Sequence, residues 1–308
     1  MIVNCSDRPS GRFRFFWSVI VAAFLLFLSS TAQAELILGA EVRVTVEDNI
    51  VGLLSGGGGS SGTGSSGATM GGSMFAASGK GFAGGTGTGS GTGNYTGGGN
   101  RSPGDLSVTA AAELGGMVEK GSRLSFFAKG FAERTDYQQY SEYDSNSAGV
   151  IAGISARSGD MLSMRVTGFD KVRRYDNDPD RDGTGYGGSA SLRQLVTDDL
   201  WLREAVEYET YRASYRDFSF RGTTYRFGMG YDMTDDLLLT AGYRYQAQHY
   251  QDSAATALRT DTASIGTDYE LSLHWSAGLL YERQTTGAGT SDMITRNNIL
   301  SLAVRWDY

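Results

Sequence analysis

The sequence predicts an all-β protein: a closed antiparallel transmembrane β-barrel of about 12 strands, with short turns at one end and long loops at the other. Three observations favour this fold class. From Glu35 onward apolar residues recur at every second position, which is the period of a strand. The connections between these segments alternate between short and long. The chain has 44 glycines and 17 tyrosines but only 3 prolines, a composition that suits strands.

The first 34 residues are typical of a signal peptide. Three arginines between residues 8 and 14 precede the apolar stretch "FFWSVIVAAFLLFL", and small residues follow at Ala32 and Ala34. We expect cleavage after Ala34, so that the mature chain begins at Glu35. A membrane anchor is the alternative, but the apolar run is shorter than the roughly 20 residues that a spanning helix needs.

Charge and cysteine content exclude several kinds of site. The one cysteine, Cys5, lies inside the predicted signal peptide, so the mature chain can form neither a disulfide nor a thiolate metal site. The formal net charge is −7, which makes nucleic acid an unsuitable partner.

The first strand is followed by a glycine-rich tract. "LILGAEVRVTVEDN" alternates apolar with polar or small residues over residues 36–49. Residues 54–104 are close to half glycine and nearly uncharged, so they cannot bury enough apolar surface to offset the entropy of ordering. We predict a flexible first extracellular loop that lies at the surface; folding inward as a constriction is the alternative.

The rest of the chain alternates strands with turns. We predict strands near residues 105–117, 121–135, 147–157, 160–174, 184–196, 199–214, 222–233, 236–250, 258–270, 273–285 and 296–308. Tight connections such as "RSGD", "VTDDLW" and "MTDDLL" alternate with longer polar ones such as "YDNDPDRDGTG" and "YRDFSFRG". An even number of strands joined in this way places all the short turns at one end of a closed barrel.

The apolar faces of these strands are predicted to point outward into lipid. Tyr225, Phe227 and Met229, for example, alternate with Arg226 and Gly228. A soluble barrel with its apolar face inside is the rival, but about 12 strands enclose too wide a space to fill comfortably with such side chains. Glu204 falls on an apolar face, and we expect a β-bulge or a different register there.

The chain ends on the amphipathic segment "ILSLAVRWDY". Together with the signal peptide and the strand rhythm of residues 35–308, this ending resembles that of bacterial outer-membrane β-barrel proteins. The resemblance implies that the barrel lies in the outer membrane, with short periplasmic turns, long extracellular loops, and membrane lipids and lipopolysaccharide around it. It also implies that the barrel-assembly machinery recognises the last strand. The recognised residues would be Leu302, Val304, Trp306 and Tyr308.

A further likeness concerns the end of the first strand. "VEDNI" at Val46–Ile50 is similar to the Asp-Asn pair that ends the first strand in some β-barrel porin families. We base no substrate on it.

Catalysis is not predicted. The mature chain has two histidines, His249 and His274. His274-Trp275-Ser276 matches the His-x-Ser pair of outer-membrane phospholipases but falls in or near a short turn, with no evident third partner. The pairs Asp198-Asp199 and Asp235-Asp236 lie at the wrong end for a protease of the omptin kind and are simpler as turn residues.

The segment "DPDRDG" is the sharpest local motif. Asp178, Asp180 and Asp182, followed by Gly183, match the first half of a calcium-binding loop, and Asp176 could supply a further ligand. The bidentate glutamate that would complete the loop is absent. A calcium site is therefore one interpretation, and an acidic solvated loop is the other; no other cofactor is predicted.

The inner face is the main candidate for function. Charged side chains of both signs are predicted to point into the lumen. They are Arg43, Lys129, Arg165, Lys171, Arg193, Arg203, Arg226, Arg244 and Arg305, with Glu41, Glu47, Glu113, Glu133, Glu207, Glu209, Asp232 and Glu282. They would either tune the selectivity of a hydrated pore or form salt bridges that plug it.

The sequence thus predicts a passive, porin-like channel for small polar solutes. The alternative is a structural or surface-interaction barrel, with a role in the export of a surface polysaccharide. Arg134, Arg174 and Arg212 have outward parity near the long loops, where they would meet either lipid phosphates or solvent.

Overall fold

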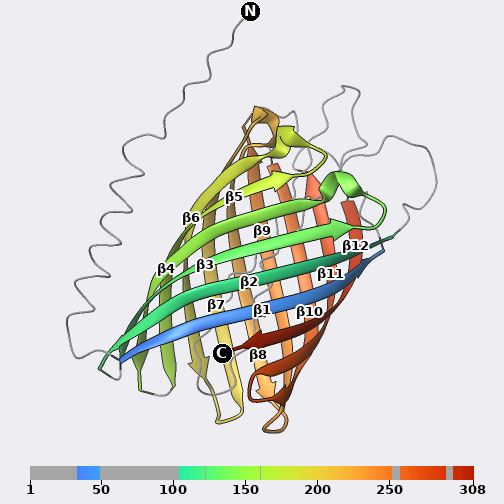
Figure 1. Cartoon of the computed structure of the whole chain (residues 1–308). Helices are drawn as coiled ribbons and strands as arrows, with labels where there is room; N and C mark the ends of the chain where they lie inside the picture. Colours follow the sequence, from blue (N-terminus) through green and yellow to red (C-terminus); the bar gives the residue numbers. More distant parts are fainter. Residues whose placement is uncertain (1–32, 49–103, 122, 160, 252–256, 289–293) are drawn as a thin grey trace, which may run out of the picture.

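The computed structural model describes residues 33–48, 104–121, 123–159, 161–251, 257–288 and 294–308. These residues form one closed antiparallel β-barrel in which each strand pairs with its neighbours in the sequence and β1 pairs with β12 (Figure 1). The predicted fold class and strand number are confirmed.

The twelve strands agree with the predicted segments to within three residues at each end. Their bounds are β1 Gln33–Glu47, β2 Asp105–Lys120, β3 Leu124–Tyr137, β4 Ser145–Ser158, β5 Leu162–Tyr175, β6 Gly183–Leu195, β7 Leu200–Ala213, β8 Phe220–Asp232, β9 Leu237–Tyr250, β10 Ala257–Ser272, β11 Trp275–Ala288 and β12 Ile294–Asp307. Of the predicted signal peptide, residues 1–32 lie outside the described residues, and Ala34 lies within β1. Almost all of the glycine tract, residues 54–103, also lies outside them.

The two ends of the barrel differ in their connections. At the short-turn end, β2–β3, β4–β5, β6–β7, β8–β9 and β10–β11 are joined by two to four residues. Gly121 and Gly159 have φ values of 67° and 63° there, a left-handed conformation that glycine adopts without a steric penalty. At the long-loop end the connections run longer, as the sequence predicted.

Three of the long connections contain a single helical turn rather than an irregular loop. These 3-10 helices are η1 Ser141–Tyr143, η2 Pro179–Arg181 and η3 Arg216–Phe218. In the part of the chain that the structure describes, no helix is long and apolar enough to cross a membrane.

The apolar faces point outward. Leu114, Tyr225 and Ile265 are 60%, 55% and 62% exposed, whereas Lys129, Glu207 and Thr262 on the opposite faces are buried. The orientation predicted from parity is therefore confirmed, and the soluble barrel with an apolar interior is excluded by this arrangement.

Glu204 is an exception to the apolar outer surface, but not for the reason that we expected. β7 keeps a regular register with both neighbours, so that Glu204 lies on the outer face between Leu192 and Phe227. The predicted bulge is wrong. A register shift occurs instead in β10, between Glu270 and Ser272, at the short-turn end of that strand.

Candidate functional site

The inner face of the barrel gathers the charged residues that the sequence predicted for it. Each lies at the parity opposite to the outward apolar side chains, and their partners across the strands share that parity. The predicted lumen residues placed there are Arg43, Lys129, Arg165, Arg193, Arg203, Glu207, Glu209, Arg226, Asp232, Arg244 and Glu282. Because these charged side chains lie together, the inner face is the candidate functional site. Its role in selectivity stays a prediction.

Several of these residues form ion pairs. Glu207 on β7 pairs with Arg226 on β8 at 3.0 Å, and Lys171 on β5 pairs with Glu209 on β7 at 2.8 Å. Arg244 on β9 lies 3.5 Å from a carboxylate oxygen of Glu282 on β11. Each of these pairs joins strands that are neighbours or that are separated by one strand. They therefore run along the wall of the barrel rather than across its lumen.

The ion pairs on the inner face of β12 and β1–β3 also join residues of the same strand or of neighbouring strands. Glu41 on β1 accepts from Arg43 on the same strand at 2.5 Å and from Arg305 on β12 at 3.1 Å. Lys129 on β3 pairs with Glu113 on β2 at 2.5 Å. These side chains are largely buried, so the pairs hold the wall charges in defined positions.

Like charges also lie side by side. Arg193 and Arg203 occupy directly paired positions on β6 and β7, and Arg226 and Arg244 do so on β8 and β9. Such pairs are unfavourable in a sheet. With Arg165 on β5, they form a row of arginines across five consecutive strands, which concentrates positive charge on one part of the wall.

Aromatic rings on the inner face lie flat against the wall because glycines face them. Phe127, Phe169 and Trp201 are each paired across the strands with a glycine: Gly153, Gly187 and Gly230. A Cβ atom at Gly153 would lie only 2.8 Å from Cζ of Phe127, and one at Gly187 would lie 2.7 Å from Cζ of Phe169. The absence of a side chain on one strand thus leaves room for a ring from the next.

A basic side chain also lies over each of these three rings. The guanidinium carbon of Arg165 is 4.9 Å from the centre of the Phe127 ring, and that of Arg193 is 4.9 Å from Trp201. Lys171 Nζ is 5.5 Å from the centre of Phe169. A cation over an aromatic face is attracted by its quadrupole. The resulting layers of glycine, ring and cation restrain these charges against the wall.

Sequence reasoning missed these rings and part of the charge. Phe127 and Phe131 were not assigned to the lumen, yet with Met117 and Ile151 they form a buried apolar cluster on the inner face. Arg173, which is 2% exposed, also points inward. Parity was a sufficient signal, because Arg173 is two residues from Lys171 and Phe131 is two residues from Lys129.

At the long-loop end, the side chain of Arg181 contacts aromatic rings from two other loops. Arg181 in η2 lies 5.0 Å from the ring centre of Tyr143 in η1 and 5.1 Å from that of Phe218 in η3. Tyr211 donates a hydrogen bond to the carbonyl oxygen of Arg181 at 2.7 Å. Burial raises the pKa of Tyr143, although the charge of Arg181 opposes the shift. Three loops therefore share one buried cation.

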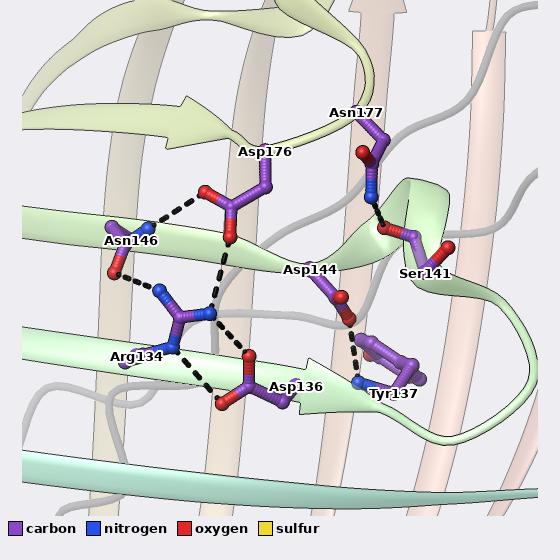
Figure 2. A network of polar contacts seen from close by, with 8 residues as sticks. All are labelled: Arg134, Asp136, Tyr137, Ser141, Asp144, Asn146, Asp176 and Asn177. Carbon is purple, nitrogen blue, oxygen red and sulfur yellow. Dashed lines mark hydrogen bonds and ion pairs between the residues drawn. The ribbon is translucent and has the colours of Figure 1, made fainter.

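A separate network of polar contacts joins β3, β4 and the residue after β5 at the long-loop end (Figure 2). The Arg134 guanidinium pairs with Asp136 at 2.6 Å and with Asp176 at 3.1 Å, and Asn146 donates to Asp176 at 3.0 Å. Asp144 accepts from the backbone N–H of Tyr137 at 2.6 Å. Arg134 is thus on the outer face as expected, but its charge is met by two carboxylates.

The four aspartates of the predicted calcium loop do not converge. Asp176 binds Arg134, Asp178 pairs with Arg181 at 2.7 Å, and Asp182 accepts from the backbone N–H of Tyr175 at 2.7 Å. Asp180 is exposed. Among the described residues no group of three acidic, histidine or cysteine side chains is placed to hold a metal ion. The loop geometry is set by these contacts, and calcium binding stays an untested prediction.

The two histidines lie apart. His249 is exposed on the outer face of β9 at the long-loop end. His274 lies in the turn between β10 and β11, where its ring stacks on Tyr308 at 5.7 Å and its Nδ1 is 3.0 Å from the carbonyl oxygen of Asp307. His274 therefore contacts the end of β12, and Ser276 lies on the inner face of β11.

The residues predicted as an assembly signal occupy the outer face of β12. Leu302 and Val304 are 53% and 39% exposed there. Trp306 stacks on Tyr308 with ring centres 6.2 Å apart, at the short-turn end. The outer face of β12 is thus apolar up to the end of the strand, while its recognition by assembly machinery stays a prediction.

Comparisons with known proteins agree with the architecture. No family model and no curated protein matches the chain. The COG4313 outer membrane channel from Pseudomonas putida F1 is similar in structure, with a TM-score of 0.61 at 9% identity over 88% of this chain and 95% of that one. The chain has the fold of an outer-membrane β-barrel channel. The barrel is less similar to the NanC porin, with a TM-score of 0.47 at 12% identity over 65% of this chain and 93% of that one.

Proposed function

We propose that the protein is a passive channel in the bacterial outer membrane for small polar solutes. The observation that supports this most is the course of the ion pairs on the inner face. Lys171–Glu209, Arg226–Glu207 and Arg305–Glu41 all connect strands that are one or two positions apart. Pairs of this kind line a wall and leave the centre of the lumen to water.

The glycine-facing rings support the same proposal. A Phe or Trp side chain that stood upright on the inner face would reach into the lumen. Phe127, Phe169 and Trp201 instead lie on glycines of the next strand. Twelve strands fall between the filled eight-stranded barrels and the conducting sixteen-stranded ones, so the disposition of the inner side chains decides whether water passes.

One observation favours the alternative, a structural or surface-interaction barrel associated with polysaccharide export. Met117, Phe127, Phe131 and Ile151 are packed together and buried on the inner face. An apolar cluster of this kind makes the side of the lumen at β2–β4 less favourable for water. A barrel that is closed inside would serve as a scaffold for its loops.

Conductance across a planar lipid bilayer tests the proposal. We expect discrete and steady current steps from the purified, folded protein. Ala111 on the inner face of β2 and Ala112 on its outer face offer a matched pair of variants. Ala111→Trp should lower the step size, because the indole enters the lumen, and Ala112→Trp should leave it unchanged. Silence from folded wild-type protein would overturn the channel and favour the scaffold.

A further inference from the structure

The inner face is polarised across its width. Because the barrel closes after twelve strands, β7 lies six strands from β1 in both directions and is therefore opposite to it. Two arcs of five strands, β5–β9 and β11–β3, are centred on these two strands. Comparing the inward charges of the two arcs gives the direction of polarisation.

The arc β5–β9 is cationic. Its inner face carries seven basic side chains and three carboxylates, a net charge of +4. The basic residues are Arg165, Lys171, Arg173, Arg193, Arg203, Arg226 and Arg244, and the carboxylates are Glu207, Glu209 and Asp232.

The arc β11–β3 is anionic. Its inner face carries nine carboxylates and three basic side chains, a net charge of −6. The carboxylates are Glu282, Asp307, Glu35, Glu41, Glu47, Asp105, Glu113, Glu119 and Glu133, and the basic residues are Arg43, Lys129 and Arg305.

The charges on the cationic arc are held in place. Phe127 and Trp201 lie beneath the guanidinium groups of Arg165 and Arg193, and glycines lie beneath those rings. The ion pairs within each arc, and the pair of Arg244 with Glu282 that joins the two arcs past β10, neutralise only part of this charge. The basic groups outnumber the carboxylates on one arc, and the carboxylates outnumber the basic groups on the other. Side chains that are fixed to the wall cannot cross the lumen to cancel the difference.

The width of the lumen preserves this separation. Twelve strands about 4.8 Å apart and tilted by about 40° enclose a barrel of roughly 24 Å between opposite backbones. Long side chains on both walls bring the charged groups closer together. The remaining gap is comparable with the Debye length of about 8 Å at physiological salt, and screening is weaker between low-dielectric walls. A solute in the lumen therefore experiences a field directed from β7 toward β1.

On the basis of the proposed channel, we infer that the lumen selects dipolar solutes: small zwitterions whose separated carboxylate and ammonium groups face the cationic and the anionic arc. The carboxylate lies against the arginine row that contains Arg193 and Arg203. The ammonium group lies against the carboxylates of β1, of which Glu47 is at the long-loop end. A neutral solute of equal size gains neither contact.

Swelling of liposomes that contain the folded full-length protein tests this inference. 4-Aminobutyrate is the zwitterionic probe, and 4-hydroxybutyramide is a neutral probe of similar size. Neither carries net charge, so no membrane potential complicates the comparison. We expect the zwitterion to enter at least about threefold faster than the neutral probe, because charge-lined walls raise the local concentration of complementary solutes.

A double variant and a matched control locate the effect. Arg193→Gln with Arg203→Gln should bring the ratio of the two rates close to one. Arg221→Gln with Arg259→Gln removes the same charge from the outer face and should leave the ratio unchanged. The shift in gel mobility on heating shows that each variant is folded. A double variant that does not fold is replaced by Arg203→Gln alone, for which the ratio should fall partway.

The possible results separate the two proposals. If no probe enters and no current flows, the channel itself is wrong. If both probes enter wild-type liposomes at equal rates, the channel stands and the selection of zwitterions is overturned. The same conclusion follows if the ratio survives the inner double variant, or if the outer control abolishes it.

Discussion

The seam between β1 and β12 differs from the eleven strand pairs that follow one another in the sequence. β1 and β2 are paired over 15 residues, whereas β1 and β12 are paired over 9, from Gly39–Asp307 to Glu47–Ile299. No turn sets the register at the seam, whose partners are more than 250 residues apart. Closure must therefore be specified by side chains, since an open edge in lipid would leave backbone groups unpaired.

Polar contacts at the seam provide that specification. Arg305 donates to Glu41 at 3.1 Å, Thr45 and Ser301 share a hydrogen bond of 3.0 Å, and Asn297 donates to Glu47 at 2.9 Å. At the end of β1, Asp48 accepts from the backbone N–H of Asn298 at 2.7 Å. The "VEDN" motif therefore has a structural role that the sequence did not reveal. Its acidic residues bind the asparagine pair of the last strand.

The largest expected effect comes from the centre of the seam. Glu41→Ala leaves Arg43 and Arg305 without their shared carboxylate, and we expect a loss of about 2–3 kcal/mol in stability. Glu113→Ala removes the partner of Lys129 within the β2–β3 hairpin and should cost less, because the turn still fixes the register. Midpoints of heat-induced unfolding, read from gel mobility, give the comparison. An equal or larger loss in Glu113→Ala would show that the seam has no special dependence on side chains.

A smaller effect is expected at the end of the seam. Asp48→Ala removes the acceptor for the backbone N–H of Asn298, and we expect a loss of about 1 kcal/mol. Asp261→Ala, which removes the acceptor for the Tyr243 hydroxyl on a hairpin-connected pair of strands, is the control for an exposed hydrogen bond. Measurements of unfolding in urea should rank Asp48→Ala as the more destabilising variant. The reverse order would contradict a role of "VEDN" in closure.

The last residues of β12 should matter for assembly more than for stability. Trp306→Ala with Tyr308→Ala removes two stacked rings at the exposed end of the chain, so we expect a change of less than about 0.5 kcal/mol in the purified barrel. The amount of folded protein in the outer membrane should nevertheless fall several-fold, whereas Tyr281→Ala on β11 should not lower it. Normal membrane levels of the double variant would remove these residues from the predicted assembly signal.

Removal of calcium is expected to have the smallest effect. Asp176, Asp178 and Asp182 are engaged by Arg134, Arg181 and the backbone of Tyr175. A chelator should therefore leave the melting temperature unchanged within about 1 °C. A clear decrease in the melting temperature that added calcium reverses would instead support the predicted calcium site.

Strand positions and the orientation of their faces followed from the sequence, because a period of two is a local property. What faces a residue on the next strand is not local. Phe127 is acceptable on the inner face only because Gly153, 26 residues later, leaves room for its ring. Glu204 likewise has regular pairing, although parity alone suggested a defect. The convergence of Arg181 with rings from two other loops depends on the barrel having formed.

The pairing of rings with glycines has an evolutionary consequence. At Gly149, an added methyl group would lie 2.7 Å from Cζ of Phe131, so neither position can change freely by itself. A larger residue at the glycine is tolerable only when the ring opposite becomes smaller. Homologous barrels should therefore show covariation between the members of such pairs, with the combined volume nearly constant and the free cross-section of the lumen preserved.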